Sequence, residues 1–195
     1  MTTASGDPDH PSEMRVIQGL ATALLGAGLG VQVFLSFLLA PTTFRAVDRS
    51  VAVHVMESVF PGYYGFGLVT IGLALVLILI LSFLEPSPLR WGAIVLLALT
   101  LAGTVYAGHV LLPQAHAARL RAEAAPAGDL APLEFSRLHR LAVAVNIAVF
   151  LTGAIALALH LAGGASDPLR QGQLDPRPRV VSSEVGHNVR SERNF

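Results

Sequence analysis

The sequence contains no cysteine and no lysine. The absence of cysteine excludes disulfide frameworks, thiolate metal sites and cysteine nucleophiles, and it leaves the redox compartment undetermined. All thirteen basic residues are therefore arginine, which excludes a Schiff-base lysine and the lysine of a phosphate-binding P-loop. Covalent catalysis by these two residue types is thus not available to this chain.

Charge is also scarce. Only 13% of the residues are charged and the formal net charge is zero, whereas soluble domains carry about 25% charged residues. Without a net charge there is no long-range field to gather nucleic acid, so no nucleic-acid partner is expected. With 53% hydrophobic residues and a mean hydropathy of +0.60, the composition predicts a multi-pass integral membrane protein of a bacterial inner membrane, with the lipid bilayer as its partner.

Four long apolar segments are present, and each is long enough to cross a bilayer, which takes about 20 residues. We expect spans at about residues 16–44, 61–84, 91–112 and 141–162, forming an all-α four-helix transmembrane bundle within residues 16–164. Two prolines in the turn at residues 85–90 make the second and third spans antiparallel neighbours. The polar ends, residues 1–15 and 165–195, are expected to be disordered tails.

A separate interfacial helix is predicted between spans 1 and 2. Valine recurs every four residues from Val47 to Val59, with charged residues elsewhere, which is typical of an amphipathic helix too short and too charged to span. A continuation of the first helix is the alternative. Phe60, Pro61 and Gly62 are expected to end this segment.

The fourth span carries polar residues at intervals of seven. His139, Asn146, Gly153 and His160 are each two helical turns apart, so they share one face of a helix. An amide in hydrocarbon needs a hydrogen-bonding partner, so Asn146 should face the bundle interior. It is either a structural bond to another helix or a contact to a ligand.

Gln32 of the first span and Thr104 of the third are the candidate partners of Asn146. Gln32 has comparable depth in the membrane, which predicts that the first and fourth spans are neighbours. His139 should then lie at the rim near Arg45. Arg45 itself is either a boundary anchor that snorkels to the headgroups or part of a cation pocket for an anionic headgroup.

His109 and His139 are the candidate metal ligands of a second hypothesis. Two histidines from different helices can hold haem or copper, although no H-E-x-x-H or similar spacing supports such a site. No carboxylate lies within a span, which argues against a transporter built on membrane carboxylates. No catalytic residue is identified.

Three stretches resemble a known family. GVQVFLSFLLAPTTFRAV at residues 30–47, VFPGYY at 59–64 and FSRLHRLAVAVN at 135–146 are similar to signatures of the transmembrane protein 205-like family. That resemblance covers about residues 16–161 and implies a small four-span membrane protein of unknown function, a fold and not a reaction. The chain departs from the pattern at Ala142, where the family commonly has serine. A fainter similarity links it to copper-resistance and haem-related four-span proteins.

The function expected from these observations is non-enzymatic. A bundle would bind or transport a small molecule or lipid, or stabilise a membrane partner, without a cofactor and with homo-oligomerisation possible. Its binding residues would be His139, Asn146, Gln32 and Arg45. The alternative is a membrane oxidoreductase that holds haem or copper through His109 and His139.

Overall fold

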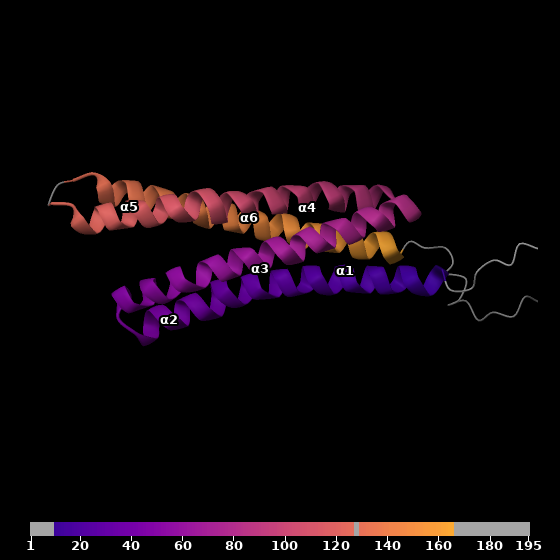
Figure 1. The fold of residues 1–195 in the computed structure, drawn as a ribbon, viewed down its shortest axis with the longest axis horizontal. Helices are drawn as coiled ribbons and strands as arrows, with labels where there is room; N and C mark the ends of the chain where they lie inside the picture. The colour runs from indigo at the N-terminus through magenta and orange to yellow at the C-terminus, as the bar shows by residue number, and fades with distance from the viewer. Residues whose placement is uncertain (1–9, 127–128, 166–195) are drawn as a thin grey trace, which may run out of the picture. The chain divides into compact units, whose positions relative to one another are not determined.

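The computed structural model describes residues 10–126 and 129–165, all of whose regular structure is helical. The helices form four long rods that are apolar enough to cross a membrane (Figure 1). The prediction of a four-helix transmembrane bundle is therefore confirmed. The predicted C-terminal tail lies outside the described residues from position 166 onward, as do the first nine residues of the N-terminal tail.

Two of the rods contain a widened turn. The first rod consists of α1 (His10–Val33), the π-helical η1 (Phe34–Leu39) and α2 (Ala40–Ala46), and the second is α3 (Arg49–Leu84). The third consists of α4 (Pro88–Tyr106), the π-helical η2 (Ala107–Leu111) and α5 (Leu112–Ala124). The fourth is α6 (Ala131–Ala165).

Each π turn ends two residues before a proline. A proline has no N–H group, and its ring displaces the carbonyl group four residues earlier. The N–H of Ala40, just before Pro41, donates to the Leu35 carbonyl, and the N–H of Leu112, just before Pro113, donates to the Ala107 carbonyl. Both bonds reach back five residues, so the widened turn lets each rod continue through its proline.

The rods are held together by small residues and a short apolar core. α1 lies along α3, and α4 lies along α6 (Figure 1). A β-carbon added at Gly103 would come within 2.7 Å of Val149 Cγ2, so the backbone of α4 closely approaches α6. The core consists of buried apolar residues from four helices: Ala21, Leu25, Ala74, Ile78, Leu97 and Ala156.

The turn between α3 and α4 is closed by a buried arginine. Arg90 is only 4% exposed, and its Nη1 atom donates to the Glu85 carbonyl at 2.6 Å and to the Leu81 carbonyl at 3.4 Å. Its Nη2 atom pairs with the Glu85 carboxylate at 2.8 Å. The Leu81 carbonyl also accepts from the Glu85 N–H at 2.8 Å, so Arg90 adds a second donor there and supplies a donor to the Glu85 carbonyl just beyond the end of α3.

The structure contains no distinct interfacial helix between spans 1 and 2, which corrects the sequence prediction. Residues 49–60 are the first turns of α3, which continues through Pro61. Val51 and Val55 are on the exposed face, whereas Ala52 and Met56 are buried, so the inward face is not the valine stripe. A proline is tolerated here because neighbouring helices support the membrane helix around it.

The helices also extend beyond the predicted spans. α1 begins at His10, so residues 10–15 of the expected tail are helical, the third rod continues to Ala124, and α6 begins at Ala131. The four candidate spans have 34 to 37 residues, or about 51–56 Å at 1.5 Å per residue. The hydrocarbon core is about 30 Å thick, so each rod projects beyond it. Charged residues at the rod ends concealed this continuity in the sequence.

Candidate functional site

Two helical hairpins form one end of the bundle. The first joins α2 to α3 at Val47 and Asp48, and the second joins α5 to α6 (Figure 1). The start of α1 and the last turn of α6 lie at the opposite end of the bundle (Figure 1). We call the end with the two hairpins the hairpin end, because two of the three cavities described below lie toward it.

The first and fourth spans meet at Gln32 and Asn146. The side chain of Gln32, which is 8% exposed, donates from Nε2 to the backbone carbonyl of Asn146 at 2.9 Å. The Asn146 amide donates instead to the hydroxyl of Tyr64 at 3.2 Å and to the Ala142 carbonyl at 2.9 Å. α1 and α6 are thus neighbours, but the two amides do not bond to each other.

An inner cavity of about 420 Å³ lies beside this contact. Its polar wall is formed by Gln32, Ser36, Tyr63 and Asn146, and the rest is apolar. Aromatic and aliphatic side chains complete it: Val33, Leu35, Phe37, Phe60, Val143, Ile147 and Phe150. Three of these eleven residues, Leu35, Ser36 and Phe37, belong to η1, so the π turn before Pro41 contributes directly to the cavity wall.

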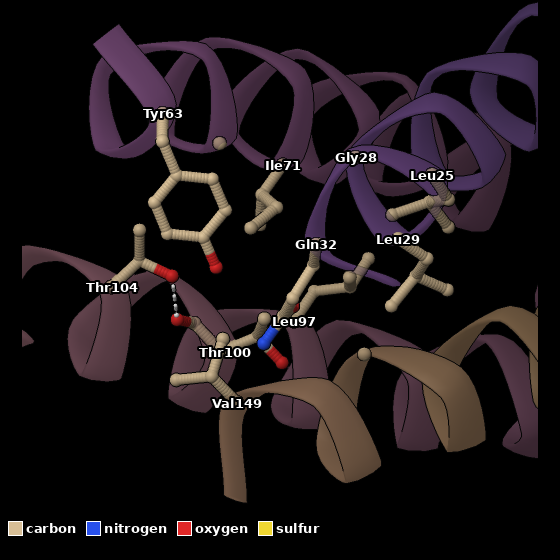
Figure 2. A pocket seen from close by; sticks show the side chains of 12 residues that line it. Leu25, Gly28, Leu29, Gln32, Tyr63, Ile71, Leu97, Thr100, Thr104 and Val149 are labelled. Carbon is tan, nitrogen blue, oxygen red and sulfur yellow. Dashed lines mark hydrogen bonds between the residues drawn. The ribbon is translucent and has the colours of Figure 1, made fainter. Parts of the chain in front are cut away.

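A smaller cavity of about 30 Å³ lies where all four rods meet. Gln32 and Tyr63 line both this cavity and the inner cavity, and Figure 2 shows the Tyr63 hydroxyl directed toward the space between the helices. Thr104 donates to the Thr100 carbonyl at 2.8 Å in the same wall (Figure 2). Thr104 is therefore occupied within its own helix and is not the partner of Asn146.

A second large cavity, the hairpin cavity, measures about 620 Å³ and lies between the two hairpins. Phe60 lines both it and the inner cavity. Its charged and imidazole side chains come from both hairpins: Arg49, Glu57, His116, Arg119 and His139. Its apolar wall includes Phe44, Met56 and Phe135.

The Glu57 carboxylate joins the two hairpins. Arg119 donates to it from Nε and Nη2, both at 2.9 Å, and His116 Nδ1 lies 2.8 Å from Glu57 Oε1. Arg119 also pairs with Glu123 at 2.7 Å. A forked arginine–carboxylate pair is a strong, directional interaction, so this cluster fixes α3 against α5.

The predicted site residues are divided between two places. Gln32 and Asn146 line the inner cavity, and His139 lines the hairpin cavity. Arg45 is exposed and lines none of the three cavities, whereas Arg49 lines the same cavity as His139. His160, the last of the polar residues on α6, is fully buried, with Nε2 3.5 Å from the Gln18 carbonyl.

The described residues give the metal hypothesis no ligand set. His109 is exposed on η2, and the histidine that shares the hairpin cavity with His139 is His116. Within residues 10–126 and 129–165 no group of three or more His, Cys, Asp or Glu side chains is placed to hold a metal ion. Haem or copper bound through His109 and His139 stays a prediction.

Several residues of the site were not predicted. The position of Tyr63 and Tyr64 at the start of the second span predicts interfacial anchors, because aromatic rings favour the membrane interface. Tyr64 is instead only 7% exposed and bonds to Asn146, and Tyr63 lines two cavities. Phe60 was expected to help break a helix and instead lines both large cavities. The available signal was the position of both tyrosines close to Pro61 in the second span. This position lies at the same depth in the membrane as Asn146 of α6.

The fold and these cavities define a four-span membrane protein with polar side chains in its interior. Residues 23–124, more than half of the chain, match the family described as "Domain of unknown function (DUF4149)", and the chain belongs to this family. An "Uncharacterized protein" of Aquifex aeolicus (strain VF5) is 47% identical over 58 residues, which are 30% of this chain and 44% of that relative. The chain thus spans less than half the length of this curated relative. No solved structure matches it.

Proposed function

We propose that this protein binds a lipid or another amphipathic small molecule in the inner and hairpin cavities, and that it does so without catalysing a reaction. The observation that carries the proposal is the inner cavity itself, an apolar space of about 420 Å³ with the Gln32 and Asn146 amides in its wall. Small-molecule sites in proteins usually have about 300–1,000 Å³, mostly apolar walls and a few well-placed polar groups.

Two polar atoms of this wall are available to a ligand. Among the described residues, Gln32 Oε1 and the Tyr63 hydroxyl form no hydrogen bond, whereas Gln32 Nε2 and the Asn146 amide are already bonded. A polar atom that faces an apolar medium without a partner is costly, so a ligand that supplies that partner is favoured. An ester or hydroxyl group of a lipid meets this requirement.

The resemblance to the transmembrane protein 205-like family supports the same place. That resemblance rests on eleven matched positions in the three stretches: Gly30, Gln32, Phe37, Phe44, Arg45, Phe60, Pro61, Tyr63, Phe135, His139 and Asn146. All of them except Gly30, Arg45 and Pro61 line the inner or the hairpin cavity. Four helical spans also support a bacterial inner membrane, because outer-membrane proteins of bacteria are typically β-barrels. Stabilisation of a membrane partner and homo-oligomerisation stay further possibilities for the same bundle.

Filling the inner cavity tests the proposal. The full chain is purified in detergent, and lipid retained after washing is measured by native mass spectrometry. Val143→Trp places a large side chain in the inner cavity, whereas Ile155→Trp is the matched control on the same helix, since Val143 is 46% and Ile155 51% exposed and only Val143 lines the cavity. We expect wild type and Ile155→Trp to retain lipid and Val143→Trp to lose most of it. Equal retention by all three proteins would refute the proposal.

A further inference from the structure

The hairpin cavity is lined by two arginines, of which one is paired with carboxylates and the other is not. Arg119 uses Nε and Nη2 on Glu57 and Nη1 on Glu123, so its guanidinium is already fully engaged by carboxylates. Arg49, at the start of α3, lines the same cavity and forms no ion pair or hydrogen bond among the described residues. Arg49 is therefore the cation of this wall that has donors to offer.

His139 approaches the cavity from the other hairpin. Its ring lies 6.1 Å from that of Phe135, and its nitrogens form no hydrogen bond within the described part of the chain. Arg49 and His139 thus present free nitrogen donors from α3 and α6, one from each hairpin, to a single space of about 620 Å³.

One positive charge of the wall has no carboxylate partner. Arg119 is paired with both Glu57 and Glu123, whereas Arg49 has no such partner among the described residues. Arg49 is also the first residue of the 36-residue helix α3, whose positive dipole end lies there, and Asp48 makes no side-chain cap to that end. A group with one negative charge and several acceptor oxygens complements this arrangement.

We infer that the hairpin cavity binds the phosphate headgroup of an anionic phospholipid, with Arg49 as its main ligand and His139 as a second donor. This inference rests on the proposed function and names its ligand class. A guanidinium matches the geometry of phosphate oxygens. Phe60 lines both the hairpin and the inner cavity, so the two cavities adjoin, and acyl chains attached to a headgroup here would extend toward the apolar space beside Gln32 and Asn146.

The experiment compares two lipids that differ in headgroup charge. Delipidated full-length protein in detergent is mixed with dioleoyl phosphatidylglycerol or dioleoyl phosphatidylcholine, and bound lipid is counted by native mass spectrometry. Arg49→Gln is the test variant. Arg45→Gln is its matched control, since Arg45 lies four residues earlier, is exposed and lines none of the cavities described.

We expect wild type and Arg45→Gln to prefer phosphatidylglycerol by about tenfold, and Arg49→Gln to lose that preference while still binding phosphatidylcholine as wild type does. Arg49→Lys, which keeps the charge, should retain most of the preference. Thermal unfolding in detergent checks that each variant is folded. A preference that survives Arg49→Gln in folded protein, or that is absent from wild type, overturns the headgroup assignment.

Two further readouts separate the possible failures. Inorganic phosphate at millimolar concentration should not displace phosphatidylglycerol; displacement would show a site for free phosphate and overturn the assignment to a lipid. If both lipids bind equally and Val143→Trp still abolishes binding, the headgroup inference fails and the proposed function stands. If neither lipid binds to wild type, the proposed function fails and the headgroup inference fails with it.

Discussion

Gln32 and Asn146 are 114 positions apart in the chain, and the side chain of one bonds to the backbone of the other at 2.9 Å. The backbone carbonyl of Asn146 accepts the bond from Gln32. The side-chain amide of Asn146 is therefore left to donate to the hydroxyl of Tyr64 of α3. One residue of α6 therefore connects to two different rods. This division of roles can be tested because the two bonds depend on different atoms of Asn146.

A double-mutant cycle between Gln32 and Asn146 should show almost no coupling. Asn146→Leu removes the amide but keeps the carbonyl that accepts from Gln32, so the loss from Gln32→Leu should be the same in either background. Each single change is expected to lower the free energy of unfolding by about 0.6 kcal/mol, the average for hydrogen bonds between membrane helices. The cycle is measured by reversible unfolding in mixed micelles.

The matched cycle pairs Asn146→Leu with Tyr64→Phe, which removes the hydroxyl that accepts from Asn146. Here the coupling should be clearly different from zero, because the two side chains bond directly. Coupling between Gln32 and Asn146 but none between Tyr64 and Asn146 would contradict the geometry described.

Replacing Gly103 by alanine should weaken the contact between α4 and α6. The added β-carbon would lie 2.7 Å from Val149 Cγ2, and overpacking of this kind costs about 1–3 kcal/mol, part of which the better helix propensity of alanine offsets. Gly72→Ala is the control, since a β-carbon there meets nothing within 4 Å. Melting temperatures in detergent should fall for Gly103→Ala only; an equal fall for both would argue against this packing.

The Glu57–Arg119 pair should contribute more to stability than the pair between Arg121 and Glu134. Side-chain exposure is 25% for Glu57 and 19% for Arg119, but 58% for Arg121 and 47% for Glu134. Exposed ion pairs contribute about 0–1 kcal/mol, whereas Arg119→Gln leaves a partly buried carboxylate without its forked partner. We expect Arg119→Gln to lower the melting temperature measurably and Arg121→Gln to leave it nearly unchanged. The reverse order would show that the hairpins are held elsewhere.

Four spans place both ends of the chain on the same side of the membrane. Reporter fusions made before residue 10 and after residue 165 should therefore report one compartment, and a fusion in the segment between α5 and α6 should report the other. An odd number of crossings, seen as opposite signals from the two ends, would require a different assignment of the helices in the bilayer.

The number of spans could be predicted from the sequence because long uncharged runs have few alternatives to crossing a membrane. The closeness of the first and fourth spans was also predictable, since Gln32 and Asn146 both need hydrogen-bonding partners in hydrocarbon. The atom that accepts the hydrogen bond from Gln32 was not predictable. It is a backbone carbonyl, which every residue has, and no residue pattern marks the carbonyl that is used.

Arg49 lines the hairpin cavity and Arg45 does not, for a simple physical reason. On one continuous helix, residues four apart share a face, so either arginine could line the same space. The backbone instead leaves the helix at Val47 and Asp48, with ψ angles of 167° and 146°, so Arg45 belongs to α2 and Arg49 to α3. The sequence around this turn has no glycine, and the valine spacing predicted an interfacial helix that already included Val47.

The side chains that line the hairpin cavity depend on the number of residues in each of the two π turns. A π turn holds one residue more than an α turn, and each residue rotates a helix by about 100°. Deleting one residue from η1 would turn Ala40 and Phe44 of α2 by that angle, and deleting one from η2 would do the same to His116 and Arg119 of α5, all of which line the hairpin cavity. The side chains that line the hairpin cavity therefore depend on one extra residue in each of two rods, and a homologue lacking either residue should line this space with different side chains.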